Sequence, residues 1–186
     1  KCQVVVYNQA GDHEGVINVV STVEEADAHA LVAWVAGAEA GCAIYESCTN
    51  MVYDGEYTVV VDKTQKELED CITAGQLVLH LVYGEVRVLR DINSLVTPGE
   101  KKNEDFKANQ TIRVIDQIAN DMAKLFNTKY LGKIPNNKSG RESLWGDIVK
   151  HHRTLETMSA IENFDASLVT VEQGDNKRSI VINDVI

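Results

Sequence analysis

The sequence predicts an α+β fold with mixed sheets, packed helices and a C-terminal β-hairpin. Three observations lead to this prediction. Short runs rich in β-branched residues are interspersed with amphipathic stretches of helical period. The chain has 186 residues, which suffices for one compact domain or two small ones. Hydrophobic residues make up 44% of it and there are 2 prolines, so a disordered chain is excluded.

The chain is expected to begin with strands at 2–7 and 16–20, each a β-rich run bounded by turn residues. A helix should follow and end near Gly41. Ser or Thr and Glu are three residues apart within 21–25, which is the spacing of a capping box, so we expect this helix to start near Val23. One face of the helix has small side chains that would let another backbone approach closely, although an ordinary buried helix explains them equally well: Ala33, Ala36, Gly37, Ala40 and Gly41.

A further strand is expected at 57–62, followed by a short helix at 65–74 that Thr64 caps. Two β-rich runs then flank Gly84 and Glu85. They predict a hairpin in which 77–83 pairs with 86–90.

The second half has the strongest helical period, at 112–126, where apolar residues recur at spacings of three and four. The segment 127–140 should break this helix, and another is expected at 141–158. Strands at 167–172 and 179–186 then close the chain as a hairpin. The apolar stripe of the second helix is expected to consist of Leu144, Trp145, Ile148, Leu155 and Met158.

Charge divides the chain unevenly. The net charge is −10, and residues 1–99 hold 5 Lys/Arg against 15 Asp/Glu, whereas residues 100–186 hold 13 of each. The polar segment 97–105 coincides with this change and predicts an internal boundary, with an acidic subdomain at 1–98 and a second subdomain at 106–186. An acidic protein is a poor direct binder of nucleic acid. No run of 18 apolar residues is present, so membrane insertion is not expected.

Motifs for catalysis or metal binding are weak. Walker, GxGxxG, GxSxG, HExxH and CxxC patterns do not occur, and we expect no catalytic residue, metal or cofactor. His152 lies near an apolar stripe, as a core histidine does, and His29 and His80 have no nucleophile beside them in sequence. A few acidic or histidine side chains remain as candidates for a cation site or for acid and base chemistry, each better explained as a solvated turn or helix surface: Asp12, His13 and Glu14; Asp147 with His151; and Glu67, Glu69 and Asp70.

Basic residues concentrate between Lys124 and Arg153, where two acids oppose them, Glu142 and Asp147. On an acidic protein this is the one concentration of charge that suggests a partner, since it complements an acidic surface of another copy or of another protein. Scattered solvated charge is the alternative. The residues are Lys124, Lys129, Lys133, Lys138, Arg141, Lys150 and Arg153.

Several segments, in order, resemble the C-terminal part of phage tail sheath proteins. The similarity is greatest to sheaths of contractile-tailed phages of Gram-positive hosts, their defective-prophage relatives and R-type bacteriocins such as diffocin. It covers nearly the whole chain and rests on the ordered set rather than on one motif. The segments are DHEGVINVV, AGAEAGCAIYESCTN, YGEVRVLRDINSL, NQTIRVIDQIANDMAKLFNTKYLGKIPNNKSGR and VTVEQGDNKRSIVINDVI.

This resemblance implies a mechanical function. Subunits of such sheaths stack as hexameric rings around a tail tube and contract to drive the tube through a target cell envelope, without nucleotide hydrolysis. The implied partners are other sheath subunits, the tail tube protein, and baseplate and terminator proteins. Assembly is expected in the bacterial cytoplasm, after which the protein forms part of the phage or bacteriocin particle. A small α+β hydrolase or ligand-binding domain is the alternative function.

The resemblance also implies site residues. In the family the C-terminal domain faces the tube, and terminal arms donate strands to neighbouring subunits. Residues 1–186 would be the sheath core, without the terminal arms, and the basic residues above would contact the tube or a neighbouring subunit. The donated C-terminal strand would include, or follow from, Ser179, Ile180, Val181, Ile182, Asn183, Asp184, Val185 and Ile186.

Overall fold

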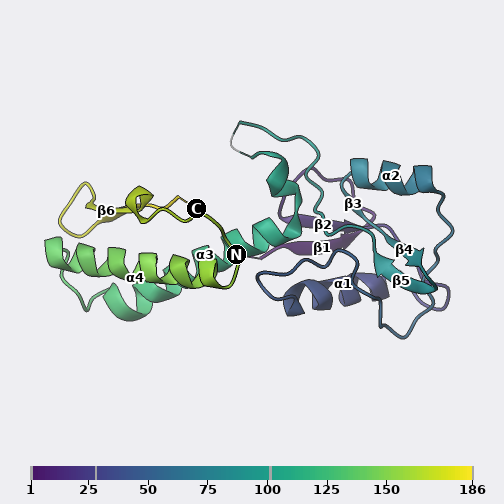
Figure 1. Ribbon diagram of the computed structural model, residues 1–186, viewed down its shortest axis with the longest axis horizontal. Helices are drawn as coiled ribbons and strands as arrows, with labels where there is room; N and C mark the ends of the chain where they lie inside the picture. The colour runs from purple at the N-terminus through teal and green to yellow at the C-terminus, as the bar shows by residue number, and fades with distance from the viewer. Residues whose placement is uncertain (1, 28, 101, 186) are drawn as a thin grey trace. The chain divides into compact units, whose positions relative to one another are not determined.

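The computed structural model describes residues 2–27, 29–100 and 102–185, and it has the predicted α+β fold (Figure 1). The chain packs as two compact units, Lys1–Asp116 and Gln117–Ile186, each of which is described by itself. Within the described ranges no helix is both long enough and apolar enough to cross a membrane.

Unit 1 contains a three-stranded parallel sheet in the order β1, β2, β3. The strands are β1 (Val4–Tyr7), β2 (Val16–Val19) and β3 (Gln76–Leu77), and Val4 lies opposite Val16. β-Branched valine and isoleucine side chains favour β1 and β2, because their restricted rotamers suit a pleated surface. The two predicted strands at the start of the chain are confirmed.

Helix α1 spans His29–Gly41, so the predicted start near Val23 is wrong. The Val23 main chain instead pairs with Val59 in an isolated antiparallel bridge. Glu25 accepts a hydrogen bond from the Thr58 amide at 2.8 Å. The apparent capping residues therefore make a tertiary contact, which overrides their local preference.

The small-residue face of α1 is exposed rather than buried. Leu31, Val35 and Glu39 form the buried face of the helix. A Cβ atom added at Gly37 would meet nothing within 4 Å. Packing within the described part of unit 1 therefore does not require small residues on this face.

The predicted strand at 57–62 is also wrong, because in this segment only Val59 forms a bridge. The helix after it is confirmed as α2 (Gln65–Thr73). Thr64 caps it and forms a complete capping box with Glu67. This box lies at an exposed helix start, where no tertiary contact competes with it.

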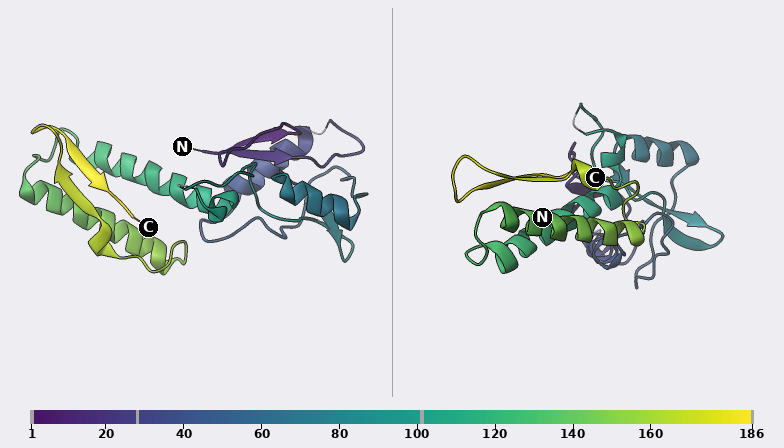
Figure 2. Two further views of the ribbon diagram at one scale, coloured as in Figure 1. Left: turned by 90° about the horizontal axis from the view of Figure 1, so that it is seen from above. Right: turned by 60° about the vertical axis from the view of Figure 1, so that its left-hand side comes forward.

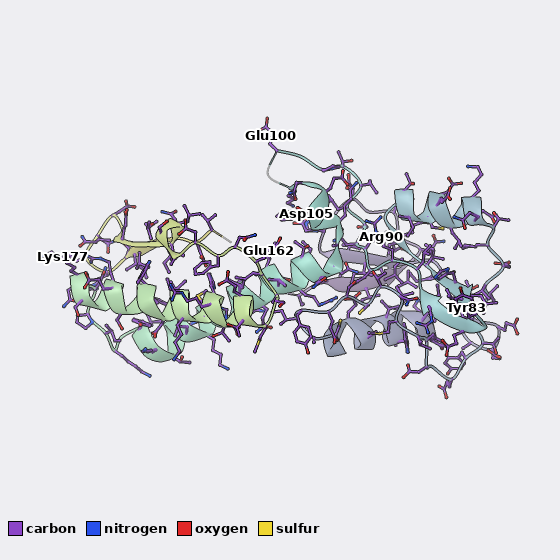
Figure 3. The ribbon with its side chains drawn as sticks, in the orientation of Figure 1. Tyr83, Arg90, Glu100, Asp105, Glu162 and Lys177 are labelled. Atoms are coloured by element: carbon purple, nitrogen blue, oxygen red, sulfur yellow. The ribbon has the colours of Figure 1, made fainter. Side chains whose placement is uncertain are left out.

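The predicted hairpin is present as β4 (Leu79–Val82) and β5 (Glu85–Val88), paired antiparallel. Its turn is Tyr83–Gly84, one residue earlier than expected. Both turn residues have positive φ, 50° and 88°, as the primed turns of two-residue hairpins require. Figure 3 shows Tyr83 at the tip of this hairpin, where its side chain is fully exposed.

Helix α3 (Asn109–Leu125) follows a short 3-10 helix, η1 (Glu104–Lys107). It begins in unit 1 and ends in unit 2, where it passes into a π-helical turn, η2 (Phe126–Tyr130). The predicted break after 126 is therefore too early, because the helical path continues to Tyr130. Tyr130, the last residue of this turn, is buried.

Unit 2 packs a β-hairpin along a long helix, as Figures 1 and 2 both show. The helix is α4 (Lys138–Thr157), capped by the Asn137 side chain. A 3-10 turn, η3 (Ala166–Leu168), leads into the antiparallel strands β6 (Thr170–Gln173) and β7 (Ile180–Asn183). Both predicted elements are confirmed, with η3 replacing the start of the first strand.

The core of unit 2 differs from the predicted apolar stripe at two positions. Trp145 and Met158 are 39% and 50% exposed. Val149 is buried on α4 in addition to Leu144, Ile148 and Leu155, and His152 is buried as the sequence predicted. The helical period alone did not distinguish these neighbouring positions.

Candidate assembly surface

The outer edge of β6 lacks a strand partner within the described chain, because β6 and β7 form a two-stranded sheet. The Gly174 amide donates to the Ser179 carbonyl at 2.9 Å, which fixes the hydrogen-bonded pairs of the hairpin. Hydrogen-bonded and non-hydrogen-bonded pairs alternate along an antiparallel ladder. The main-chain N–H and C=O groups of Val169, Val171 and Gln173 therefore point away from β7. Val169 is already bonded within unit 2, because its carbonyl accepts from Trp145 Nε1 at 3.0 Å and its amide donates to the Ala166 carbonyl at 3.3 Å. The edge at Val171 and Gln173 is left for another partner.

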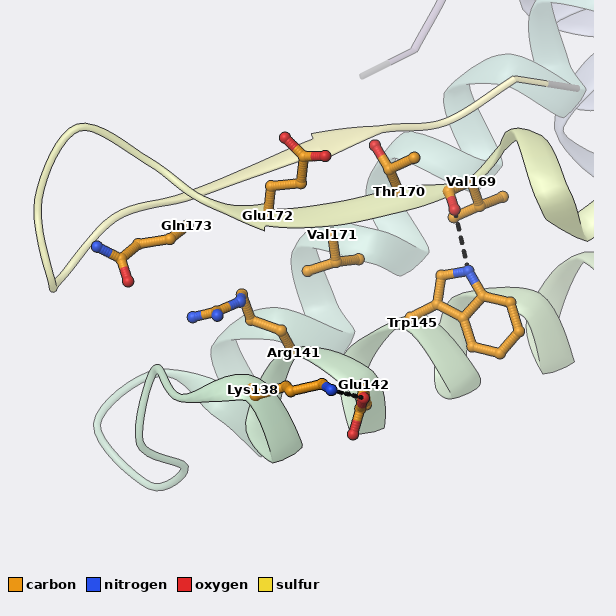
Figure 4. Close-up of a pocket in the computed structure, with 9 residues that line it drawn as sticks. All are labelled: Lys138, Arg141, Glu142, Trp145, Val169, Thr170, Val171, Glu172 and Gln173. Carbon is orange, nitrogen blue, oxygen red and sulfur yellow. Dashed lines mark hydrogen bonds and ion pairs between the residues drawn. The ribbon is translucent and has the colours of Figure 1, made fainter.

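A groove of about 520 Å³ runs between this edge and α4 (Figure 4). Its floor and walls combine apolar side chains with two cations and two carboxylates. An extended segment lying here would meet main-chain hydrogen-bonding groups on one side and mixed side chains on the other. The lining residues are Lys138, Arg141, Glu142, Trp145, Val169, Thr170, Val171, Glu172 and Gln173.

The predicted inter-subunit strand is mostly paired within its own chain. Ile180–Asn183 form β7 and pair with β6, and Ser179 closes the turn. Asp184 contacts His152, and Val185 is exposed. Ile186 lies outside the described residues. A role of 179–186 in joining subunits stays a prediction.

The basic residues of 124–153 are arranged in separate pairs rather than as one patch. Lys138 and Arg141 line the groove beside β6, whereas Lys150 and Arg153 line a shallow depression of about 470 Å³ on α4. The side chains of Lys150 and Arg153 are both exposed. These two places are where the predicted cations are presented together.

The basic residues also have partners inside unit 2: Lys138 lies 3.9 Å from Glu142, and Arg141 donates to Asn136 Oδ1 at 3.0 Å. Lys129 pairs with Asp147 at 2.5 Å, and this contact raises the pKa of Lys129. Lys133 Nζ donates to the Thr128 carbonyl at 2.6 Å. Lys124 is exposed near the end of α3. The Lys129 contact helps to hold the π turn against α4.

The histidine and acidic candidates take local roles. Asp12 accepts from the amides of Val96 and Thr97, and hydrogen bonds from these two residues lower the pKa of Asp12. His13 Nδ1 accepts from the Gly15 amide at 2.9 Å. Asp147 and His151 do not form a cation site, because Asp147 binds Lys129 and Tyr130 while His151 contacts Asp121.

The acid and base candidates on α2 do not converge on a pocket. Glu67 caps the helix, Glu69 accepts from Gln65, and Asp70 pairs with Lys66 at 3.3 Å, all on the exposed surface. This arrangement is the ordinary surface of an amphipathic helix.

Sequence reasoning missed a buried ionic cluster in unit 1. Arg113, in the first turns of α3, contacts the carboxylates of Glu39 on α1 and of Asp91, whose side chain is fully buried. Asn109 Nδ2 donates to Asp91 at 2.7 Å and to Glu39 at 3.1 Å. The cluster therefore ties the start of α3 to α1 and to the segment after β5.

The two carboxyl groups of this cluster hold different charges. Burial and a hydrogen bond shared with Asp91 raise the pKa of Glu39 to about 8. Burial alone would also raise the pKa of Asp91, but the hydrogen bond from Glu39, the Cys48 amide and the Arg113 charge hold it below its ordinary value. At neutral pH Glu39 is thus protonated and Asp91 is ionised, which leaves the cluster with Arg113 close to neutral.

Cys48 also borders this cluster. Glu39, Cys48 and Asp91 are all buried, and each has one potential ligand atom within 4.8 Å of those of the other two. The guanidinium of Arg113 already contacts both carboxyl groups, and burial raises the pKa of the Cys48 thiol. The arrangement is that of an internal ion pair with its carboxylates hydrogen-bonded.

Comparison with known proteins matches nearly the whole chain to one family. Residues 1–94 match the phage tail sheath protein central domain, and residues 101–186 match the phage tail sheath C-terminal domain. A similar curated relative is the phage-like element PBSX protein XkdK of Bacillus subtilis strain 168, which is 30% identical, with 98% of this chain and 42% of the relative covered.

Two solved structures agree in fold. The sheath tail protein from Desulfitobacterium hafniense has a TM-score of 0.83 at 35% identity, covering 92% of this chain and 42% of that one. The sheath tail protein from Listeria innocua has a TM-score of 0.85 at 28% identity, covering 97% and 44%. The chain thus spans less than half the length of these proteins.

Proposed function

The chain belongs to the phage tail sheath family, and from this we propose that it acts in a contractile tail sheath that polymerises as helically stacked hexameric rings around a tail tube. Contraction of the sheath would drive the tube through a target cell envelope. The family match over 1–94 and 101–186 carries the proposal. The function is mechanical, and its energy comes from subunit contacts rather than from catalysis.

The proposed partners follow from the same premise. The chain would contact other sheath subunits, the tail tube protein, and baseplate and terminator proteins. It would not bind nucleic acid directly or insert into a membrane. Assembly would take place in the bacterial cytoplasm, before the sheath becomes part of a particle. Within the subunit, 1–98 would form the acidic part and 106–186 the inner part facing the tube.

The groove beside β6 is the proposed place where a neighbouring subunit adds a strand. The main chains of Val171 and Gln173 point outward, so an extended segment can continue the ladder. The same surface presents Lys138 and Arg141, which would pair with acidic groups of the incoming subunit or of the tube.

Proline substitutions on β6 test this contact. Gln173→Pro removes an outward amide, so the hairpin should stay folded while assembly of the intact protein is lost. Gln173→Ala keeps the amide and should assemble normally. Glu172→Pro removes an amide that bonds to β7 and should instead lower thermal stability. Assembly of the Gln173→Pro protein at the normal rate would reject the β6 edge as the contact.

Electron microscopy of the intact protein tests the function as a whole. Hollow striated cylinders are expected on incubation with purified tail tubes. The variant with Lys138, Arg141 and Lys150 all changed to Glu should assemble poorly, and unchanged assembly would remove these cations from the interface. A monodisperse protein with hydrolytic activity, under conditions in which sheaths assemble, would contradict the proposal.

A further inference from the structure

Four titratable side chains form a continuous line through unit 2. Asp121 on α3 lies 2.9 Å from His151 Nε2, and the Nδ1 atoms of His151 and His152 lie 3.1 Å apart. His152 Nε2 is then 2.8 and 2.9 Å from the two carboxylate oxygens of Asp184, the residue after β7. The line joins α3 and α4 to the end of the C-terminal strand.

Three contacts in this line need three protons. A hydrogen bond holds one hydrogen between its two heavy atoms, and ionised carboxylates can only accept. Both Nε2 atoms must therefore donate, and one Nδ1 must donate to the other. Two neutral imidazoles supply only two N–H groups, so a third proton is required to satisfy every contact, and the pair then carries one positive charge.

The carboxylates at the two ends of the histidine pair favour this charge, whereas burial opposes it. His152 is fully buried, and its ring and that of Phe164 meet edge to face with centroids 5.1 Å apart, so water does not replace a lost contact there. Gln117 Nε2 donates to the second oxygen of Asp121 at 2.9 Å. Partial burial would raise the pKa of Asp121, but the bonds from Gln117 and His151 hold it below its ordinary value. A carboxylate thus lies at each end of the histidine pair.

The remaining charged groups nearby do not supply the third proton. On α3, Lys124 lies near Asp121. On α4, Asp147 is paired with Lys129, Glu156 accepts from the Phe164 amide at 3.0 Å, and Lys150 and Arg153 are exposed. On the hairpin side the charged group that meets the pair is Asp184.

We propose that Asp121, His151, His152 and Asp184 form a proton-dependent clamp that holds the chain after β7 against α4. When the shared proton leaves to solvent, two N–H groups remain for three contacts, and one contact is lost. The facing Nδ1 lone pairs repel each other, or one ring exchanges its tautomer and turns a lone pair toward a carboxylate. Either change loosens the end of β7 together with Asp184 and Val185, the described residues that follow it.

For the proposed sheath function, this clamp would regulate when the C-terminal segment becomes available to a neighbouring subunit. That consequence rests on the proposed function, whereas the clamp itself does not. The segment would stay on its own subunit while the histidine pair is charged, and it would be released for pairing when the pair is neutral.

Amide hydrogen exchange of this chain tests the clamp directly. Protection of 180–185, corrected for the intrinsic exchange rate, should fall about ten- to a hundred-fold between pH 5.5 and pH 8.5, because a charge-assisted hydrogen bond is lost across the range in which imidazoles change charge. His151→Ala should abolish this dependence, since neutral His152 can then donate to Asp184 at both pH values. His29→Gln, at an exposed position in unit 1, should leave the dependence intact.

Nitrogen-15 spectra of the imidazole groups provide a test without mutation. At pH 5.5 the two rings should together carry at least three N–H protons while the segment is protected. Protection of 180–185 that does not change with pH, an equal loss in His151→Ala, or two neutral rings in the protected state would each overturn the clamp. If cylinders form although protection is independent of pH, the clamp is wrong and the sheath function stands. If protection follows pH as expected but no cylinders form, the function is wrong and the clamp stands.

Discussion

Replacing Glu39 by glutamine should remove a pH dependence from the stability of unit 1. The pKa of Glu39 is raised to about 8 in the folded chain, whereas an exposed glutamic acid has a pKa of about 4.3. Between these pH values the folded chain keeps a proton that the unfolded chain has lost. The contribution of Glu39 is therefore complete below about pH 4.3, and it is lost as the pH rises to about 8.

The size of this effect follows from the same two pH values. Each pH unit in that range is worth about 1.4 kcal/mol, which sets a ceiling of about 4 kcal/mol between pH 5 and pH 8. Ionised Glu39 would draw in water and strengthen its contact with Arg113, so we expect a loss of about 2 kcal/mol. In the Glu39→Gln variant the side-chain amide can donate to Asp91 as protonated Glu39 does, and the variant should lose almost nothing over this pH range.

Urea unfolding followed by circular dichroism, at intervals from pH 5 to pH 8.5, measures this difference. The comparison of wild type with Glu39→Gln cancels the contributions of all groups that the two proteins share. Glu24→Gln, at an exposed position of the same unit, should behave as wild type. The reasoning is refuted if wild-type stability is constant to pH 8, or if Glu39→Gln loses stability as steeply.

Three further changes test other parts of unit 1 by the same unfolding measurement. Arg113→Ala leaves the Asp91 charge buried without its partner and should cost about 3 to 5 kcal/mol; a cost below about 1 kcal/mol would mean that the cluster is not a buried ion pair. Gly37→Ala should gain about 0.5 to 1 kcal/mol, because the added methyl group meets open space, and a loss of stability would contradict the exposed face. Thr64→Ala should cost about 1 kcal/mol through the capping box with Glu67, whereas an unchanged midpoint would show that the cap is dispensable.

Local signals predicted those elements whose local and tertiary preferences agree. The box of Thr64 with Glu67 starts α2, and the glycine at position 84 sits in a two-residue turn with positive φ. The similar spacing of Ser21 with Glu24 failed, because Ser21 Oγ instead accepts from the Leu79 amide at 2.9 Å. The contact with a distant strand prevents a helix start here, and the local sequence pattern does not indicate that contact.

The sequence indicated which basic residues cluster along the chain, but it did not indicate how the fold arranges them. The basic residues of 124–153 were found from their clustering, yet the fold separates Lys138 and Arg141 from Lys150 and Arg153. The ionic cluster of Glu39 and Arg113 was missed because these two residues lie 74 positions apart. A single sequence has no signal for such pairing, apart from a glutamate on the buried side of a helix.

The π turn at Phe126–Tyr130 has a consequence for insertions and deletions in this family. A π turn accommodates one residue more than an α-helical turn, and so acts as a stored single-residue insertion. Deleting one residue between 126 and 130 should restore an α-helix and rotate the following side chains by about 100°. Tyr130 would then turn away from Ser143 and Asp147, so a one-residue gap here in an alignment would mark a sheath with different packing on α4.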